Sequence, residues 1–146
     1  MIVGEASVTV SVPPSAVLEF VLDLERYRQA DRKIGRIGAV ERDGDHGTFR
    51  FSGRIRGLPA PSGTYPFTIE GGSLRVGSPI AGAARFFLNF EGTFDCEETD
   101  HGTVVTHREV FDFKSPFRWV AEPLLRRWLE ADTAQEMVRF KQLIEA

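Results

Sequence analysis

The chain has 146 residues, of which 42% are hydrophobic and 27% charged, and its formal net charge is −3. This length and composition predict a single soluble domain over residues 1–146 that buries its own core. The acidic balance argues against a nucleic-acid partner, which would need a basic excess on one face. No apolar run reaches the roughly 20 residues that a membrane-spanning helix requires, so no integral membrane segment is expected. The lone cysteine, Cys96, excludes an internal disulfide and fits a reducing compartment, which predicts a cytoplasmic protein.

The first thirty residues predict a strand followed by a short helix. Polar and apolar residues alternate strictly over 5–12, which is typical of a half-buried strand. Pro13 and Pro14 end this strand. Apolar residues at helical spacing then predict a helix that begins at Ser15 and ends between Tyr27 and Ala30.

Strand patterns dominate the middle of the chain. Two strands are expected over 33–43 and 48–57, then a loop or edge break over 58–63. Short strands follow around Tyr65–Ile69 and Leu74–Val76, and two longer ones over 85–98 and 103–114. In the strand over 85–98 one face is expected to carry Phe86, Leu88, Phe90, Gly92, Phe94 and Cys96. Because short turns join consecutive strands, the pattern predicts an antiparallel meander.

The tail from Phe117 to Ala146 has a helical pattern with too many apolar residues for a solvent-facing helix. The preceding sheet is the only partner long enough to cover such a helix, and a ligand has room between the two. This arrangement makes a small-molecule pocket the leading functional hypothesis.

Two apolar stripes on this tail point roughly 160° apart at 100° per residue. Because Pro123 suits the first turn of a helix, we expect a separate turn over 117–122 and a main helix from Pro123 to Glu145. The later stripe is expected to face the sheet. The earlier one would cover the cavity mouth, pack against the first helices or form a homodimer contact through Leu124 and Trp128. The earlier stripe is Val120, Ala121, Leu124, Trp128 and Ala131, and the later one Met137, Phe140 and Ile144.

Two segments of the chain resemble the START-like superfamily, also called SRPBCC, which includes polyketide cyclases and lipid-transfer domains. Val8 to Tyr27 is similar to the family's first strand and helix, and Asp23-Leu-Glu-Arg-Tyr27 to the junction with the next helix. Phe140-Lys-Gln-Leu-Ile-Glu-Ala146 is similar to its helical ending. The resemblance implies an α+β helix-grip fold, in which a curved antiparallel β-sheet wraps around a long C-terminal helix, with two short helices after the first strand and a cavity inside. Because this fold hosts binding proteins, transporters and enzymes, it does not determine the chemistry.

The strand over 103–114 carries the candidate catalytic residues, His107 and Glu109. Both share the phase of Val105 and Phe111, and residues two apart on a strand project from one face about 7 Å from each other. They are candidates for a general acid/base pair or for contacts to the polar end of a ligand. The alternative is that they satisfy each other or a backbone group, or that a bulge turns the opposite face inward.

Other polar residues give weaker signals. The three histidines and one cysteine lack metal-ligand spacing, so neither a metal site nor a cofactor is expected. Arg50, Arg54 and Arg56 form a basic stripe on the outer face of their strand. This stripe is interpreted as a solvated face or as a contact for an anionic surface or partner.

Three hypotheses follow. In the first, the protein binds a hydrophobic small molecule such as a lipid, isoprenoid or polyketide. In the second, it is an aromatase/cyclase-type enzyme in which His107 or Glu109 moves protons. In the third, it is a non-catalytic module that meets a protein partner through the Leu124/Trp128 stripe. The expected ligand contacts are Tyr65, Phe90, Phe94, Phe111 and Met137 around the cavity, with His107 and Glu109 at the polar end.

Overall fold

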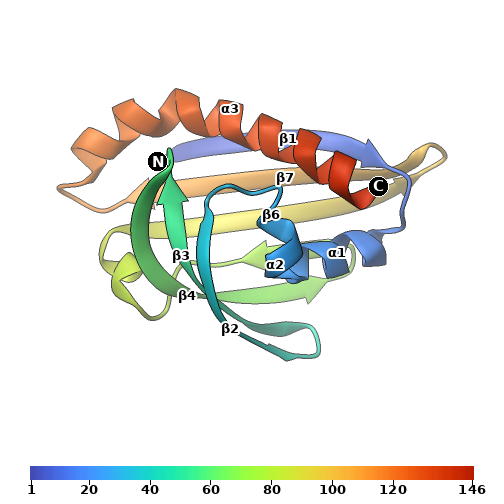
Figure 1. Ribbon diagram of the computed structural model, residues 1–146, viewed down its shortest axis with the longest axis horizontal. Coiled ribbons are helices and arrows are strands. Elements are labelled where there is room, and N and C mark those ends of the chain that lie inside the picture. Colours follow the sequence, from blue (N-terminus) through green and yellow to red (C-terminus); the bar gives the residue numbers. More distant parts are fainter.

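Seven antiparallel strands form one curved sheet in the order β1-β7-β6-β5-β4-β3-β2 in the computed structural model, which describes residues 1–146 (Figure 1). The strands are β1 (Ile2–Val10), β2 (Ile34–Asp43), β3 (His46–Ile55), β4 (Leu58–Glu70), β5 (Ser73–Val76), β6 (Leu88–Thr99) and β7 (Gly102–Phe113). Helices α1 (Pro14–Leu22) and α2 (Leu24–Tyr27) follow β1, a 3-10 turn (Ala83–Phe86) precedes β6, and α3 (Arg118–Ile144) follows β7. The expected helix-grip fold is confirmed. No helix is both long and apolar enough to cross a membrane.

Helix α3 lies along β1 and β7, as Figure 1 shows. Its buried residues recur at helical spacing: Leu125, Leu129, Asp132, Thr133, Glu136, Met137 and Phe140. Gly4 in β1 permits the close approach, because a Cβ there would collide with Thr133 Oγ1 and lie 3.0 Å from the carbonyl oxygen of Leu129. The centre of the buried face of α3 is therefore polar, with apolar residues on both sides of it.

Two separate hydrophobic cores lie at the two ends of α3. The larger one joins α1, α2, the sheet and the C-terminal half of α3, and Phe20 packs edge-to-face on Phe140 there with 5.7 Å between ring centroids. The smaller one joins Leu125 and Leu129 to β1 and β7. The polar part of α3 lies between these two cores.

Two strand boundaries differ from the sequence prediction. The loop expected over 58–63 belongs to β4, because a two-residue turn at Arg56-Gly57 returns the chain directly, with Ile55 paired to Leu58. The prolines of this segment are tolerated beside a register shift between Ser52 and Arg54. The strand expected from residue 85 begins at Leu88, and Phe86 lies in the 3-10 turn with 64% of its surface exposed.

The prediction of a separate turn before Pro123 was wrong. Helix α3 continues through Pro123 without a separate turn, and Leu124 is 57% exposed, whereas Leu125 and Leu129 are buried. The later stripe was placed correctly, since Met137 and Phe140 are fully buried in the larger core. A search for apolar residues alone missed that the same buried face also carries Glu136 and Thr133. A homodimer contact through Leu124 and Trp128 stays a prediction.

Candidate functional site

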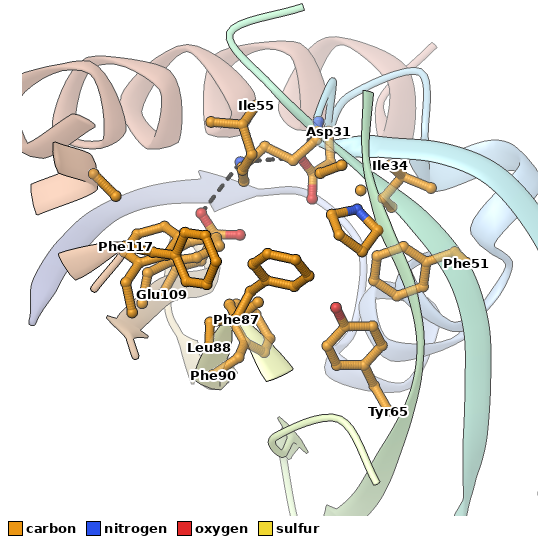
Figure 2. Close-up of a pocket in the computed structure, with 17 residues that line it drawn as sticks. Asp31, Ile34, Phe51, Ile55, Tyr65, Phe87, Leu88, Phe90, Glu109 and Phe117 are labelled. Atoms are coloured by element: carbon orange, nitrogen blue, oxygen red, sulfur yellow. Dashed lines mark hydrogen bonds and ion pairs between the residues drawn. The ribbon is translucent and has the colours of Figure 1, made fainter. Parts of the chain in front are cut away.

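A cavity of about 260 Å³ lies between the concave side of the sheet and the start of α3 (Figure 2). It is slightly smaller than the ligand pockets of about 300–1,000 Å³ that are common in proteins. Its apolar walls come from β3, β4, β6, β7 and the segment before α3. The aromatic residues of these walls are Phe51, Tyr65, Phe87, Phe90, Phe111, Phe113 and Phe117.

Contacts between aromatic rings connect the four strands that form the cavity walls. Phe51 of β3 stacks on Tyr65 of β4 at 4.7 Å between centroids, and Tyr65 meets Phe90 of β6 edge-to-face at 5.9 Å. Phe90 in turn meets Phe111 of β7 at 5.1 Å. Each ring comes from an inward position of its strand, so the alternation of the four strands builds one continuous aromatic surface.

Asp31, Lys33 and Glu109 form the charged end of the cavity. Figure 2 shows Asp31 and Glu109 on the side of the cavity nearest the long helix, away from Tyr65. Asp31 and Lys33 come from the segment between α2 and β2, and Glu109 from the inward face of β7. The sheet and this connecting segment thus bring charged groups to one end of an otherwise apolar space.

Lys33 is the centre of a buried ion-pair network, with only 6% of its surface exposed. Its Nζ lies 2.9 Å from Asp31 Oδ1 and 3.2 Å from Glu109 Oε2. From α3, Asp132 Oδ2 lies 2.6 Å and Glu136 Oε1 2.7 Å from the same nitrogen. Burial alone would lower the pKa of Lys33, but the surrounding carboxylates outweigh burial and hold its pKa well above the usual value. Lys33 is therefore a permanent cation.

His107 lies behind Glu109 and joins the same network. Its Nε2 is 3.1 Å from Glu136 Oε2 and 3.3 Å from Glu109 Oε1, and its ring stacks on Phe94 with 3.9 Å between centroids. The Nε2 contacts are ion pairs without good hydrogen-bond geometry. Nδ1 lies 2.9 Å from the Thr93 carbonyl, which accepts only, so Nδ1 carries a proton. Burial lowers the pKa of His107, but the Glu136 and Glu109 charges outweigh it and raise the pKa well above 6.5, which makes His107 an imidazolium at neutral pH.

Glu136 is fully buried and accepts contacts from three directions. Tyr27 Oη donates a hydrogen bond to its Oε2, while Lys33 and His107 supply positive charge. Burial raises the pKa of Glu136, but the positive charges of Lys33 and then of His107 outweigh burial and bring this pKa well below its usual range. Burial, followed by the charge of Glu136, raises the pKa of Tyr27 well above 10. Glu136 is thus a fixed anion and Tyr27 a neutral donor.

Asp31 differs from the other groups because it titrates near neutrality. Burial and then the charge of Glu136 raise its pKa to about 7, although Lys33 acts in the opposite direction. A carboxyl group with such a pKa holds and releases a proton readily at physiological pH. Because Asp31 also lines the cavity, it is suited to proton exchange with a bound molecule.

The acidic residues also form two groups with the spacing of metal ligands. They are His107 with Glu109 and Glu136, and Asp31 with Asp132 and Glu136, each with ligand atoms within 4.8 Å of one another. The Lys33 ammonium already lies within hydrogen-bond distance of the second group. An imidazolium has no lone pair for a metal in the first. The residues fit an ion-pair network better than a metal centre.

The structure brings four of the seven expected ligand contacts to the cavity surface: Tyr65, Phe90, Glu109 and Phe111. His107 and Phe94 lie behind them, beside an adjoining space of about 60 Å³. Met137 is fully buried and lies in the larger core, so it lines neither space. The cavity instead meets α3 at Ala121, which belongs to the earlier apolar stripe near the start of that helix.

Five charged or polar residues of the site were missed: Tyr27, Asp31, Lys33, Asp132 and Glu136. The sequence held a signal for the last two, since a step of four residues back from Phe140 reaches Glu136 and a second such step reaches Asp132. No periodic signal marks Asp31 and Lys33, which lie in an irregular segment on both sides of the exposed Arg32.

A family model described as polyketide cyclase/dehydrase and lipid transport matches residues 1–145. No curated protein matches the chain in sequence. Among solved structures, a Thermus thermophilus protein superposes with a TM-score of 0.77 at 16% identity, covering 97% of this chain and 96% of its own.

Two further neighbours have descriptive names. A STAR-related lipid transfer protein from Xanthomonas axonopodis has a TM-score of 0.72 at 13% identity, covering 97% of this chain and 85% of its own. The Zhui aromatase/cyclase from Streptomyces has a TM-score of 0.66 at 17% identity, and the superposition covers 97% of this chain and 90% of the Zhui chain. These superpositions establish a shared fold. The family match over residues 1–145 confirms the START-like assignment made from sequence.

Proposed function

Because the chain belongs to the polyketide cyclase/dehydrase and lipid transport family, we propose that it binds a hydrophobic small molecule in the cavity between its sheet and α3. The molecule is of the lipid, isoprenoid or polyketide kind. The observation that carries this proposal is an aromatic cavity of about 260 Å³ with charged groups at one end only. Apolar walls with a few placed polar groups are the usual composition of a small-molecule site.

Each lining residue has a distinct role in this proposal. Phe90 and Phe111 contact the apolar body of the ligand, and Glu109 meets its polar end together with Asp31. Burial raises the pKa of Tyr65 to about 12, so its hydroxyl stays neutral and is available as a donor to the ligand. His107 acts from behind by holding Glu109 in place.

A second candidate function is catalysis of the aromatase/cyclase type. The observation in its favour is that Asp31, with a pKa of about 7, and Glu109 both face the cavity. A bound polyketide chain would exchange protons with these carboxyl groups as the cavity orders it for ring closure. His107 would position Glu109 and support its charge. The name of the Streptomyces neighbour supports this candidate, and that of the Xanthomonas neighbour supports binding or transfer.

Native mass spectrometry of the purified protein tests the binding function by detecting a co-purified hydrophobic molecule. Ala60→Phe places a ring in the cavity wall and is expected to abolish binding of that molecule or of an uncharged naphthalene probe. Ala39→Phe adds the same ring to exposed β2 and serves as the matched control. Equal probe affinity in the two variants, with both folded by circular dichroism, would contradict the proposal.

The two candidate functions separate at Glu109 and Asp31. For an enzyme, Glu109→Gln and Asp31→Asn are expected to stop turnover of a polyketide-like substrate while binding persists. For a binding protein, the same variants change affinity and no turnover is detected in the unmodified chain.

A further inference from the structure

A second concave surface, outside the cavity, gathers four arginines. This groove of about 630 Å³ is lined by Arg28 and Arg32 from the segment around the end of α2, by Arg54 and Arg56 from the end of β3, and by α3. Figure 1 shows the end of β3 reaching toward α3, which brings these distant segments together. Arg50, the third member of the basic stripe noted in the sequence, does not line the groove. The arginine cluster in the folded protein therefore differs from the stripe along β3, because Arg28 and Arg32 join it and Arg50 does not.

These arginines are not neutralised by the protein. Arg32, Arg54 and Arg56 have no carboxylate within 4.0 Å, and Arg28 lies only at 3.7 Å from the exposed Glu25. The one acidic residue that lines the groove, Asp132, is already bound to Lys33 at 2.6 Å. Positive charges that converge without a counter-charge repel one another, so the groove attracts anions.

The backbone of Arg56 provides an independent observation. Arg56 has a φ of 52° and is the only residue other than glycine in the chain with positive φ. With Gly57 at 80° it forms a two-residue hairpin turn, where asparagine, aspartate or glycine is the usual first residue. An arginine in this position is unfavourable for the backbone, yet the turn directs it into the groove.

We propose that this groove binds the phosphate group of an organic phosphate. A phosphate monoester carries close to two negative charges and three acceptor oxygens, which suits several guanidinium groups better than a single carboxylate does. The groove is larger than a phosphate ion alone requires. The rest of the lining comes from Ile34, Gly57 and three residues of α3: Trp128, Asp132 and Gln135. The organic part of the ligand packs against the indole ring of Trp128 beside the Gln135 amide.

The groove is separate from the proposed hydrophobic site. Ile34 is the one residue that lines both. A phosphate in the groove and a hydrophobic ligand in the cavity would therefore occupy different spaces, joined behind the walls by the Lys33–Asp132 ion pair. Ala60→Phe fills the cavity away from that pair and is expected to leave phosphate binding unchanged.

Calorimetric titration with phenyl phosphate tests the proposal, with benzoate and benzyl alcohol as comparison ligands. We expect phenyl phosphate to bind at least about tenfold more tightly than benzoate, since it makes additional charge-assisted hydrogen bonds, and benzyl alcohol not to bind. Affinity should fall as salt rises from about 0.01 to 0.15 M, because the groove is open to solvent. Equal affinity for benzoate and phenyl phosphate would overturn the proposal.

Arg54→Gln and Arg56→Gly are each expected to weaken the binding of phenyl phosphate by about tenfold or more, because each variant loses one charged contact to the ligand. Arg50→Gln removes the same charge from the same strand outside the groove and should leave affinity unchanged. Arg56→Gly also separates binding from folding: glycine adopts positive φ freely, so the melting temperature should hold or rise while affinity falls. If Arg50→Gln weakens binding as much as Arg56→Gly, the groove is not the site.

Vesicles distinguish a soluble phosphate from a lipid headgroup. Sedimentation with vesicles that contain phosphatidic acid, compared with vesicles of phosphatidylcholine alone, shows whether the phosphate is reached on a membrane. Binding of phenyl phosphate without vesicle binding assigns the groove to a soluble phosphate, and binding of both assigns it to a phosphate-bearing headgroup. Vesicle binding without phenyl phosphate binding would refute a phosphate site and indicate general attraction to a charged surface.

Discussion

Replacing Lys33 by methionine removes the central cation of the buried network while nearly preserving its length. Four carboxylates then lose their shared partner, and His107 is the only positive charge left beside them. Breaking a buried ion pair from one side typically costs about 3–5 kcal/mol, because the remaining charge is uncompensated. We therefore expect Lys33→Met to be among the most destabilising single substitutions in the chain.

Protonation gives an independent magnitude for the same change. A carboxyl group with an ordinary pKa near 4 needs about 4 kcal/mol to stay protonated at pH 7, at about 1.4 kcal/mol per pH unit. At pH 5 the same step costs only about 1.4 kcal/mol. Asp31, whose pKa is about 7, is already about half protonated at pH 7 in the unmodified protein. The free energy of protonation is therefore needed mainly for a neighbouring carboxyl group. The expected loss of stability is thus about 4 kcal/mol at pH 7 and much less at pH 5.

The direction of this pH effect follows from linkage. Lys33 lowers the pKa of both Asp31 and Glu136, and burial raises both. Without Lys33 these two pKa values rise, so stability in the variant is highest at low pH and is lost as pH rises. In the unmodified chain the pKa of Glu136 is instead lowered, so its contribution is intact from pH 7 to pH 5 and is lost only as pH falls below the unfolded value of 4.5. The stability difference between the two proteins must therefore narrow on acidification.

Urea unfolding followed by circular dichroism at pH 7 and pH 5 measures this difference directly. Lys114→Met is the control, because Lys114 is exposed and its Nζ donates to one backbone carbonyl, that of Arg85. A loss below about 1 kcal/mol at pH 7, or an equal loss at both pH values, would refute a network centred on Lys33.

Three further predictions concern the same network and its support. NMR titration of the ring of His107 should show an imidazolium at pH 7.5, and Glu136→Gln should lower its pKa, because the carboxylate that contributes most to holding the proton is gone; a ring already neutral at pH 7.5 would contradict the assignment. Gly4→Ala should cost about 1–3 kcal/mol in urea unfolding because its Cβ overlaps α3, whereas Gly77→Ala, whose Cβ meets its nearest atom at 3.4 Å, should cost less than 1 kcal/mol. Since burial raises the pKa of Asp31 to about 7, its ionisation destabilises the fold as pH rises from about 4 to 7, and Asp31→Asn should flatten the fall in stability over that range. A melting-temperature profile parallel to that of the unmodified protein would show that Asp31 does not titrate there.

Much of the fold was predictable because alternation along the strands is a local signal. The phase of β7 was correctly derived from Val105 and Phe111, and the structure buries His107 and Glu109 on that same face. The order of strands and helices carried the resemblance to the START-like fold. The start of β4 was predicted too late because Pro59 and Pro61 were interpreted as the end of strand structure. In the folded protein these prolines are tolerated beside a register shift.

The charged site was less predictable because its residues meet only in three dimensions. Lys33 and Asp31 lie in an irregular segment, and no periodicity distinguishes them from the exposed Arg32 between them. Asp132 and Glu136 were hidden by a different cause: a helical wheel that scores only apolar residues assigns charged positions to solvent. The buried face of α3 is recognisable only when its charged residues are allowed to have buried partners elsewhere in the chain.

The same polar centre of α3 explains why the two hydrophobic cores do not merge. Buried ion pairs are weak evidence for stability, since apolar residues of similar volume often replace them without loss. A network of four carboxylates around one ammonium is therefore poorly explained as a device for folding. Its position gives the better explanation, because Lys33, Asp31 and Glu109 reach the cavity surface while Asp132, Glu136 and His107 fix them from behind. The charged residues that face the cavity are thus held by a set of buried charges that do not line it.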